Sequence, residues 1–226
     1  MLFRSSTRAP CSSTGRDLLT SANAAAIRTK AGTVIGTDVE AHDSDLTTIA
    51  GLSPANDDFL QRKSGAWTNR TPTQARKDLG APLVMTGGTQ MSHTGDTAES
   101  TFTTITLPGG SLGPNGQMEM ELLVSGTGSG NKTFRIKFGG TTYTGYVLSG
   151  SNTSAQIRLR IANRNSQSSQ VSFNAGTVGA GSGASTSSLI TSSVDSSADV
   201  SILLTGQLAT GTDTLSIESW ILRAYY

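Results

Sequence analysis

The sequence predicts a mainly β protein, in which a jelly-roll-like antiparallel β-sandwich over residues 83–226 follows short helices and a β-hairpin in residues 1–82. Three observations support this fold class. After Pro82 apolar residues recur at every second position, which is the period of a half-buried strand. Gly-rich and Ser-rich turn signals return about every ten residues. No helical pattern interrupts these strands, so about eight to ten of them must pack as a sandwich or barrel.

The N-terminal part predicts short elements that cannot fold alone. Residues 1–14 are rich in Ser, Thr and Arg without periodicity, so we expect an arm that is ordered only against a partner. A helix is expected over residues 18–31, with Thr20 or Ser21 as its N-cap and Gly32 as its end. Residues 43–50 predict a second helix, capped by Asp43 or Ser44.

A hairpin and a third helix follow directly. Residues 59–62 and 66–70 are strand-like, and we expect residues 63–65 to connect them as a three-residue loop with Gly in third place. Thr71, followed by Pro72 and Gln74, predicts a helix that begins with a capping box and ends at Gly80.

Helices of fewer than about 12 residues and single hairpins are marginal in water, so these elements need partners. Copies of the same chain are the simplest candidate. We expect four apolar residues to contribute to this oligomerisation: Phe59, Leu60, Trp67 and Leu79. Among them Trp67 should anchor the hairpin to neighbouring chains.

The strands of the sandwich can be placed individually. Residues 117–124 put Met118, Met120 and Leu122 on one face, and residues 155–162 put Ile157, Leu159 and Ile161 inward. Other strands are expected over residues 101–107, 134–138, 141–148, 171–174, 188–194, 200–205 and 214–222. The Gly/Ser-rich residues 176–187 predict a surface loop.

The segment DDFLQRKSGAWTNRTPTQARKDLG, residues 57–80, resembles a recurrent segment of bacteriophage tail-fibre proteins. In that family a D-x-L-Q-R-x-x-G-x-W hairpin leads into a T-P-x-Q-A-R-x-x-L-G helix. GRDLLTSANAAAIRTKAG, residues 15–32, looks like the shorter linker motif of the same family. ANRNSQSSQ, residues 162–170, resembles C-terminal β-sandwich domains of phage structural proteins. The resemblance implies a trimeric virion fibre or spike, attached to other virion proteins through its N-terminal part. Because residues 1–15 do not have the apolar core of a secretory signal, we expect assembly in the host cytoplasm.

Composition excludes several classes of function. Charged residues make up 15% of the chain and the formal net charge is +1, which argues against nucleic acid or an anionic membrane surface as the main partner. No apolar run reaches the roughly 18 residues of a membrane helix, so membrane insertion is not expected. Cys11 is the single cysteine, which excludes an intrachain disulfide.

We predict neither catalysis nor a cofactor or metal site. Glu119 and Glu121 share a strand face and could be imagined as a glycosidase pair, but paired acids on a solvated strand are common. Asp96 and Glu99 lie near His93 in the sequence, but their spacing matches no metal-binding loop. Asp195 and Asp199 suggest a turn between strands. With two His in the chain, a His-based triad is also not expected.

A ligand-binding surface is predicted from aromatic and planar polar side chains, which sugar-binding surfaces use. The alternative is that outward Arg residues blunt sheet edges and maintain solubility. The predicted ligand-binding residues are Tyr143, Tyr146, Arg158, Arg160, Asn163, Arg164 and Asn165.

The sequence therefore predicts a non-enzymatic phage virion protein, a short tail fibre or spike whose sandwich recognises a glycan or protein on the host surface. An alternative is a head fibre or capsid decoration protein without receptor binding.

Overall fold

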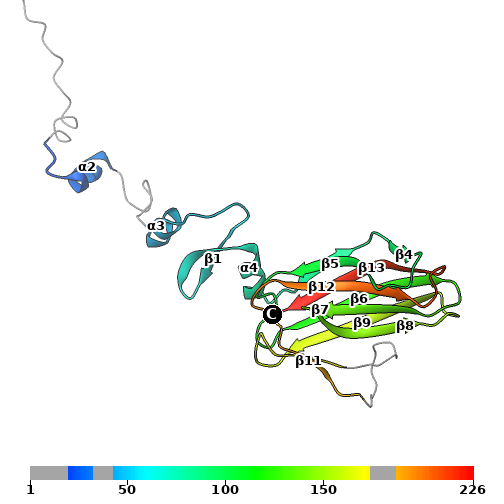
Figure 1. Cartoon of the computed structure of the whole chain (residues 1–226). Coiled ribbons are helices and arrows are strands. Elements are labelled where there is room, and N and C mark those ends of the chain that lie inside the picture. Colours follow the sequence, from blue (N-terminus) through cyan, green and yellow to red (C-terminus); the bar gives the residue numbers. More distant parts are fainter. Residues whose placement is uncertain (1–19, 33–42, 174–186) are drawn as a thin grey trace, which may run out of the picture. The chain divides into compact units, whose positions relative to one another are not determined.

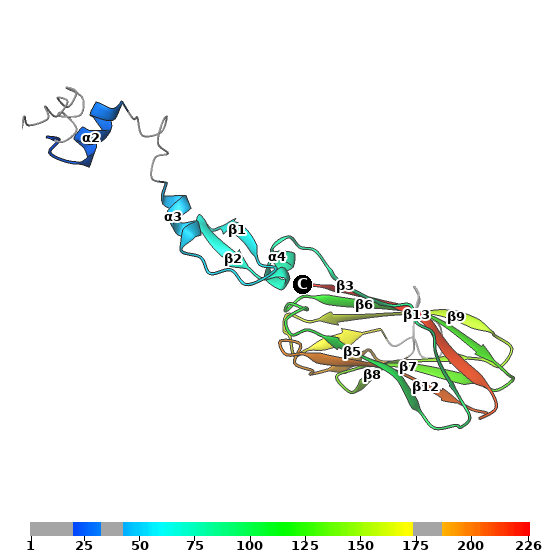
Figure 2. The same cartoon turned by 90° about the horizontal axis from the view of Figure 1, so that it is seen from above.

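The computed structural model describes residues 20–32, 43–173 and 187–226, which form a mainly β protein (Figures 1 and 2). The chain divides into two compact units, Met1–Asn69 and Arg70–Tyr226. Sequence analysis placed this boundary near Pro82, so the structure moves the third short helix into the second unit. The predicted arm of residues 1–14 and almost all of the predicted loop 176–187 lie outside the described residues.

The first unit contains two short helices, α2 (Ala24–Ala31) and α3 (Ser44–Ala50). Helix α2 begins later than predicted, because Asn23 caps it by accepting a hydrogen bond from the Ala26 N–H at 2.9 Å. The expected caps Thr20 and Ser21 are therefore wrong. Asp43 caps α3 as predicted, accepting from the Asp45 N–H at 2.7 Å.

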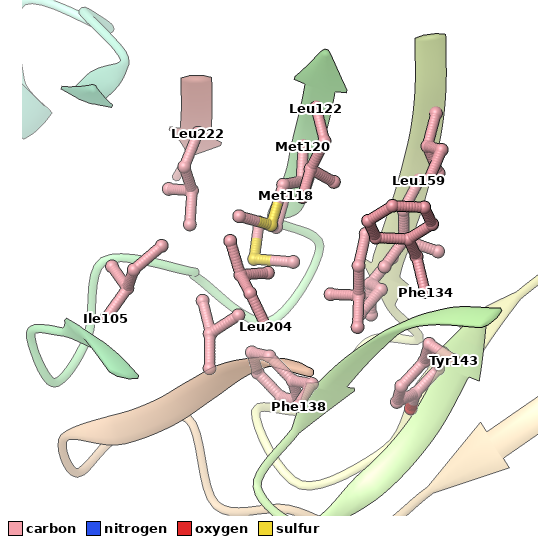
Figure 3. Packing of buried hydrophobic residues seen from close by; sticks show 14 of the residues in the cluster. Ile105, Met118, Met120, Leu122, Phe134, Phe138, Tyr143, Leu159, Leu204 and Leu222 are labelled. Carbon is pink, nitrogen blue, oxygen red and sulfur yellow. The ribbon is translucent and has the colours of Figure 1, made fainter. Parts of the chain in front are cut away.

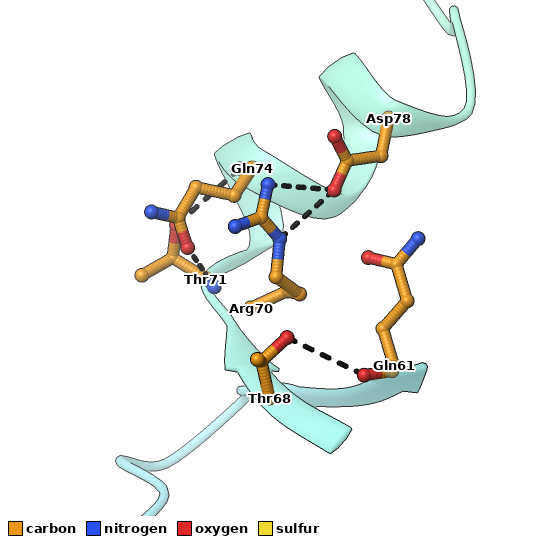
Figure 4. A network of polar contacts seen from close by, with 6 residues as sticks. All are labelled: Gln61, Thr68, Arg70, Thr71, Gln74 and Asp78. Carbon is orange, nitrogen blue, oxygen red and sulfur yellow. Dashed lines mark hydrogen bonds and ion pairs between the residues drawn. The ribbon is translucent and has the colours of Figure 1, made fainter. Parts of the chain in front are cut away.

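The predicted hairpin consists of β1 (Phe59–Lys63) and β2 (Ala66–Arg70). Its connection has two residues rather than three, because Lys63 continues β1. Ser64 and Gly65 both have positive φ, 53° and 85°, which is the geometry of a type I′ turn. The Thr68 hydroxyl donates to the Gln61 carbonyl across the hairpin (Figure 4).

Helix α4 (Pro72–Asp78) confirms the predicted capping box. The Gln74 N–H donates to Thr71 Oγ1 at 3.3 Å, and the Thr71 N–H donates to Gln74 Oε1 at 3.0 Å (Figure 4). Arg70 adds an ion pair to Asp78 at 2.6 Å. Gly80, with φ 66°, follows the helix where a left-handed residue was predicted.

The rest of the second unit is a two-layer antiparallel sandwich. The larger sheet has the order β11-β10-β9-β6-β13-β3, with β4 also paired to β13, and the smaller sheet has the order β5-β12-β7-β8. The strands are β3 (Leu83–Gly87), β4 (Met91–Thr94), β5 (Ser100–Leu107), β6 (Gln117–Thr127), β7 (Lys132–Phe138), β8 (Thr141–Leu148), β9 (Ser154–Asn163), β10 (Gln170–Ser172), β11 (Ile190–Ser192), β12 (Val200–Leu208) and β13 (Thr214–Tyr225).

This order is a jelly roll. Strands β4, β13, β6 and β9 face strands β5, β12, β7 and β8, and the chain alternates between the two sheets from β4 to β7. It then forms the β7–β8 hairpin and crosses again at β8–β9, β11–β12 and β12–β13. The predicted fold class is therefore confirmed. Strands β3 and β4 were missed by the sequence analysis.

The core lies between the sheets and is built from the predicted alternation (Figure 3). Met118, Met120 and Leu122 of β6 are buried, and they face Phe134 and Phe138 of β7 across the sandwich. Large apolar side chains from both layers exclude water, which is the main favourable term in folding. The described core is continuous, so the two sheets form one body.

The two ends of the sandwich differ. At one, which we call the α4 end, the Lys77 ammonium lies 4.6 Å from the centroid of the Tyr226 ring, so α4 and the C-terminus lie together (Figure 1). Strand β6 leaves this end at Gln117, paired with Tyr225, and reaches the opposite end at Thr127, paired with Thr214. We call that opposite end, formed by loops 95–99, 128–131, 149–153 and 209–213, the far end.

Candidate functional site

The seven predicted ligand-binding residues do not form one surface. Tyr143 and Tyr146 belong to the smaller sheet, Arg158 and Arg160 to the outside of the larger sheet, and residues 163–165 to the α4 end. The predicted cluster is therefore divided among three places.

Tyr143 is buried, and its assignment to a binding surface is wrong. Its ring packs edge-on against Phe138 with centroids 6.2 Å apart, and its hydroxyl shares a 2.5 Å hydrogen bond with Ser192 Oγ. Burial raises the pKa of Tyr143, partly opposed by the Ser192 hydrogen bond. Tyr146 is half-buried and packs against the core beside its partner Phe134. Both rings therefore serve the interior.

Asn163 is also buried, and its side chain is fully engaged within the protein. Its amide donates to the Gly113 carbonyl at 2.8 Å and to Ser196 Oγ at 3.1 Å, and its oxygen accepts from Gln170 Nε2 at 3.0 Å. Gln167 continues the network by donating to the Leu112 carbonyl at 2.8 Å. The prediction that Asn163 contacts a ligand is therefore wrong.

The segment 162–170 is thus a structural connector. Gln170 Oε1 accepts from Ser192 Oγ at 2.9 Å and from the Val194 N–H at 3.0 Å. Three loops that are distant in sequence are tied together at the α4 end in this way: the β5–β6 loop, the β9–β10 turn and the β11–β12 loop. Buried polar groups with satisfied hydrogen bonds hold such loops in one conformation.

Arg164 and Asn165 are exposed, as predicted, at the tip of the β9–β10 turn. Asn165 has φ 51°, the left-handed conformation that Asn tolerates better than most residues. Because the turn lies at the α4 end, these two side chains are on the side of the sandwich where the chain enters it.

Arg158 and Arg160 are exposed on the outside of the larger sheet, as predicted. Cross-strand register places Glu121 opposite Arg158, and their side chains form an ion pair at 3.0 Å. Glu119 lies in register between Arg160 on β9 and Arg223 on β13. We call these five residues the charged face.

Glu99 is the centre of a second charged group, on the outside of the smaller sheet. Its carboxylate contacts Lys137 Nζ at 2.6 Å, accepts from Thr205 Oγ1 at 2.5 Å and lies 3.4 Å from Arg135 Nη1. The pKa of Glu99 is lowered, chiefly by Lys137 and then by Thr205, while partial burial opposes the shift. The sequence analysis considered Glu99 beside His93 and Asp96 and missed its partners on β7.

At the far end the loops are held by a buried cation that the sequence analysis missed. Lys132 is fully buried, and its ammonium donates to the carbonyls of Gly128 and Gly130 at 2.8 Å each and lies 3.5 Å from Asp213. Asp213 also accepts from the Gly130 N–H at 2.7 Å. The alternation of β7 could have signalled Lys132, because it falls on the same face as Phe134.

Exposed side chains at the far end are mostly small and polar, and the 95–99 loop adds the carboxylates of Asp96 and Glu99. The small polar side chains include Thr97, Ser129, Asn131, Asn152 and Thr210. Backbone hydrogen bonds join neighbouring loops, such as the Gly95 N–H to the Gly211 carbonyl at 2.8 Å and the Ala209 N–H to the Asn131 carbonyl at 2.9 Å. The far end is therefore an ordered surface of hydroxyl and amide groups with two carboxylates at the 95–99 loop.

Three of the other carboxylates considered above have structural partners. Glu121 also accepts a hydrogen bond from Gln156, and Asp195 accepts from the Ser197 N–H at 2.9 Å. Asp199 accepts from the Gly109 N–H at 2.8 Å. Within residues 20–32, 43–173 and 187–226, no group of three or more His, Cys, Asp or Glu side chains is arranged to hold a metal ion.

The residues predicted for oligomerisation differ in exposure. Phe59 and Leu60 on β1 are exposed, and so is Leu79 at the end of α4, whereas Trp67 on β2 is half-buried. The indole Nε1 of Trp67 is inaccessible to solvent and has no hydrogen-bond partner within the described chain. Leu79 belongs to the second unit, and the other three residues belong to the first.

None of the helices in the described part of the chain is long and apolar enough to span a membrane. No family model matches the chain, and no curated protein matches its sequence.

Solved structures with similar folds are distant in sequence. The CBM36-1 domain of a multidomain xylanase from the hindgut metagenome of Trinervitermes trinervoides is 12% identical with a TM-score of 0.34, and the match covers 62% of this chain and 95% of that chain. Dimeric latent PorU from Porphyromonas gingivalis is 10% identical with a TM-score of 0.33, and the match covers 63% of this chain and 12% of that chain. The VP2 subviral particle of infectious bursal disease virus is 10% identical with a TM-score of 0.34, and the match covers 74% of this chain and 37% of that chain. This chain therefore spans a small part of PorU and about a third of VP2, and the likeness concerns the β-sandwich fold alone.

Proposed function

We propose that this chain is a structural protein of a phage virion, a short tail fibre or spike. Its first unit self-associates and attaches to other virion proteins, and its β-sandwich is displayed and recognises the host surface. The observation that carries the proposal is the contrast between the two units. The described residues of the first unit bury no side chain fully, whereas the sandwich has a complete core.

The first unit needs partner chains for a physical reason. Helices α2 and α3 have eight and seven residues, and Ile27, Leu46, Phe59 and Leu60 remain between 43% and 54% exposed. Elements this short are unstable without tertiary packing. Pooling the apolar side chains of several chains supplies that packing, in agreement with the fibre-like motif of residues 57–80.

The sandwich is suited to display. The chain enters it at the α4 end, so the far end is the part that extends furthest from the point of entry along the strands. We assign host recognition to the far end, whose hydroxyl and amide groups suit a neutral glycan or a protein surface. Several copies in one fibre would raise the effective concentration of weak sites.

A binding experiment tests this assignment. The full chain should bind purified envelope of the host bacterium, and Asn131→Arg with Ser151→Arg should abolish the binding by placing bulky charges on the far end. The control variant Arg164→Glu, at the α4 end, should bind like the unaltered chain. Loss of binding in the control and retention in the far-end variant would overturn the assignment.

The alternative, a head fibre or capsid decoration protein without receptor binding, is favoured by one observation. The loops of the far end, 95–99, 128–131, 149–153 and 209–213, contain no aromatic residue that could stack against a sugar ring. If the full chain does not bind host envelope at all, display or shell stabilisation becomes the better proposal.

A further inference from the structure

Exposed large apolar side chains in the described sandwich unit are absent from the smaller sheet. Among the described residues, each of them lies on the larger sheet, next to one of its strands, or at an end of α4 or of the chain. They are Leu79, Val84, Leu123, Phe173, Leu189, Tyr225 and Tyr226. The described strands of the smaller sheet expose none and carry outward polar and charged side chains, such as Thr104 and Lys137, instead. Contiguous exposed apolar surface marks an interaction site.

Four of these residues gather at the α4 end. Leu79 follows α4, Val84 lies on β3, Tyr225 ends β13 and Tyr226 follows it, with exposed fractions of 78%, 50%, 38% and 60%. Strand β3 pairs with β13 through Val84 and Arg223, two residues before Tyr225. We call these four residues the apolar collar.

A row of charges lies beside Val84 and Tyr225, the two collar residues on the outer face of the larger sheet. Register aligns Arg160, Glu119, Arg223 and Val84 across four adjacent strands. In the described part of the chain, the side chains of Arg160, Glu119 and Arg223 form no ion pair or hydrogen bond with one another or with other residues. The row therefore has an acidic centre with a basic residue on each side, and none of its charges is neutralised by a direct contact.

We infer that second copies of this chain pack against the apolar collar and the adjacent charge row. A partner must supply apolar surface and alternating charge in the same patch, and another copy of the row meets that requirement because Glu119 can face Arg160 or Arg223. A uniformly charged or purely apolar partner would leave one sign of charge desolvated and unpaired.

The position of the collar supports the same partner. It lies at the end of the sandwich where the chain joins the first unit, which exposes apolar residues of its own. Self-association of the first units would raise the effective concentration of the attached sandwiches, which favours a contact between their collars. This inference rests on the self-association in the proposed function, and it adds a specific interface within the sandwich.

The interface has a consequence for recognition. It would cover Arg160 and leave the far end and the smaller sheet accessible to the host. The exposed Arg residues of the larger sheet would then serve assembly, whereas the sequence analysis assigned them to ligand binding.

Cross-linking tests the inference in the full chain. Cys11→Ser removes the single native thiol, and a new thiol is placed either by Val84→Cys in the collar or by Thr104→Cys on the outside of the smaller sheet. Both positions are outward and exposed on edge strands. A short bismaleimide should join Val84→Cys chains into covalent dimers and leave Thr104→Cys chains single.

A second pair of variants measures the strength of the contact. Val84→Asp should raise the protein concentration needed for association by about ten- to a hundredfold, because it replaces buried apolar surface with a charge. Thr104→Asp should leave that concentration unchanged, as measured by light scattering.

The outcomes separate the two proposals. If the chain self-associates but positions 84 and 104 cross-link equally, the collar interface is wrong. The same holds if neither position cross-links. Both results leave the proposed function standing. A chain that is monomeric at all concentrations overturns self-association as well.

Discussion

Asn163 is the residue on which the ordering of the α4 end depends most directly. Its amide connects the β5–β6 loop to the β11–β12 loop, and its oxygen holds Gln170, which in turn holds Ser192. A buried amide with three partners cannot be removed without leaving other polar groups unpaired.

Asn163→Ala should therefore lower the free energy of unfolding by about 2 to 4 kcal/mol, because the Gly113 carbonyl and the Gln170 amide lose a buried partner. The matched control is Arg164→Ala, the next residue and an exposed one, which should cost less than about 0.5 kcal/mol. Urea unfolding of the two variants provides the comparison, and equal effects would show that Asn163 is not a structural residue.

Lys132 has the corresponding role at the far end. Lys132→Met should lower the free energy of unfolding by about 3 to 5 kcal/mol, because Asp213 is left buried without its cation. Adding Asp213→Asn should restore part of that loss, since the amide oxygen can still accept from the Gly130 N–H. If urea unfolding shows that the double variant is less stable than Lys132→Met, the buried Lys132–Asp213 pair does not hold the far-end loops as described.

Glu99 predicts a dependence of stability on pH. Lys137, Thr205 and Arg135 lower its pKa in the folded protein, so the ionised form favours folding. Its contribution is fully present above the unfolded pKa of about 4.3 and is lost as the pH falls through the lower folded pKa. Glu99→Gln should therefore destabilise the protein at pH 6 more than at pH 3 in urea unfolding; equal losses at both would refute the role.

At single residues the sequence predicts burial better than role. Strict alternation placed Ile157, Leu159 and Ile161 inside and Arg158 and Arg160 outside, because apolar burial follows the strand period. Tyr143 and Asn163 were misassigned since their polar atoms suggested solvent, while their partners come from loops distant in the sequence. Such partners follow from tertiary contacts, which no local pattern contains.

At the scale of elements, the hairpin and α4 show what local chemistry can specify. The capping box of Thr71 and Gln74 and the left-handed Gly80 are determined by residues within one short segment. Strands β3 and β4 were missed because they are short edge strands with Gly between them, and their pairing with β13 is long-range. The jelly-roll class could be predicted from strand number and spacing, but the strand order could not.

The hairpin also predicts how the chain assembles. Trp67→Ala should dissociate the oligomer and cost several kcal/mol, as truncation of a large aromatic side chain does. The control Ser64→Asn keeps the left-handed turn and should leave the assembly intact. If light scattering gives the same mass for the Trp67→Ala variant and the unaltered chain, Trp67 does not anchor the hairpin to neighbouring chains.

For the whole molecule, the proposed function follows from the difference between the two units of the chain. Short elements with exposed apolar residues come first, and a self-sufficient jelly roll comes second. Under the two proposals the sandwich is divided again, with the far end assigned to the host and the apolar collar with its charge row assigned to other copies. The sequence motif led to the fibre proposal, and the exposed side chains of the sandwich suggest which surfaces such a fibre would use.

The most direct test of the central proposal is immunogold electron microscopy of intact phage particles with an antibody against residues 83–226. We predict gold at the tail, where a fibre or spike displays its sandwich. Gold distributed over the capsid would contradict the tail placement in favour of a head fibre or decoration protein, and particles without gold would contradict a virion role altogether.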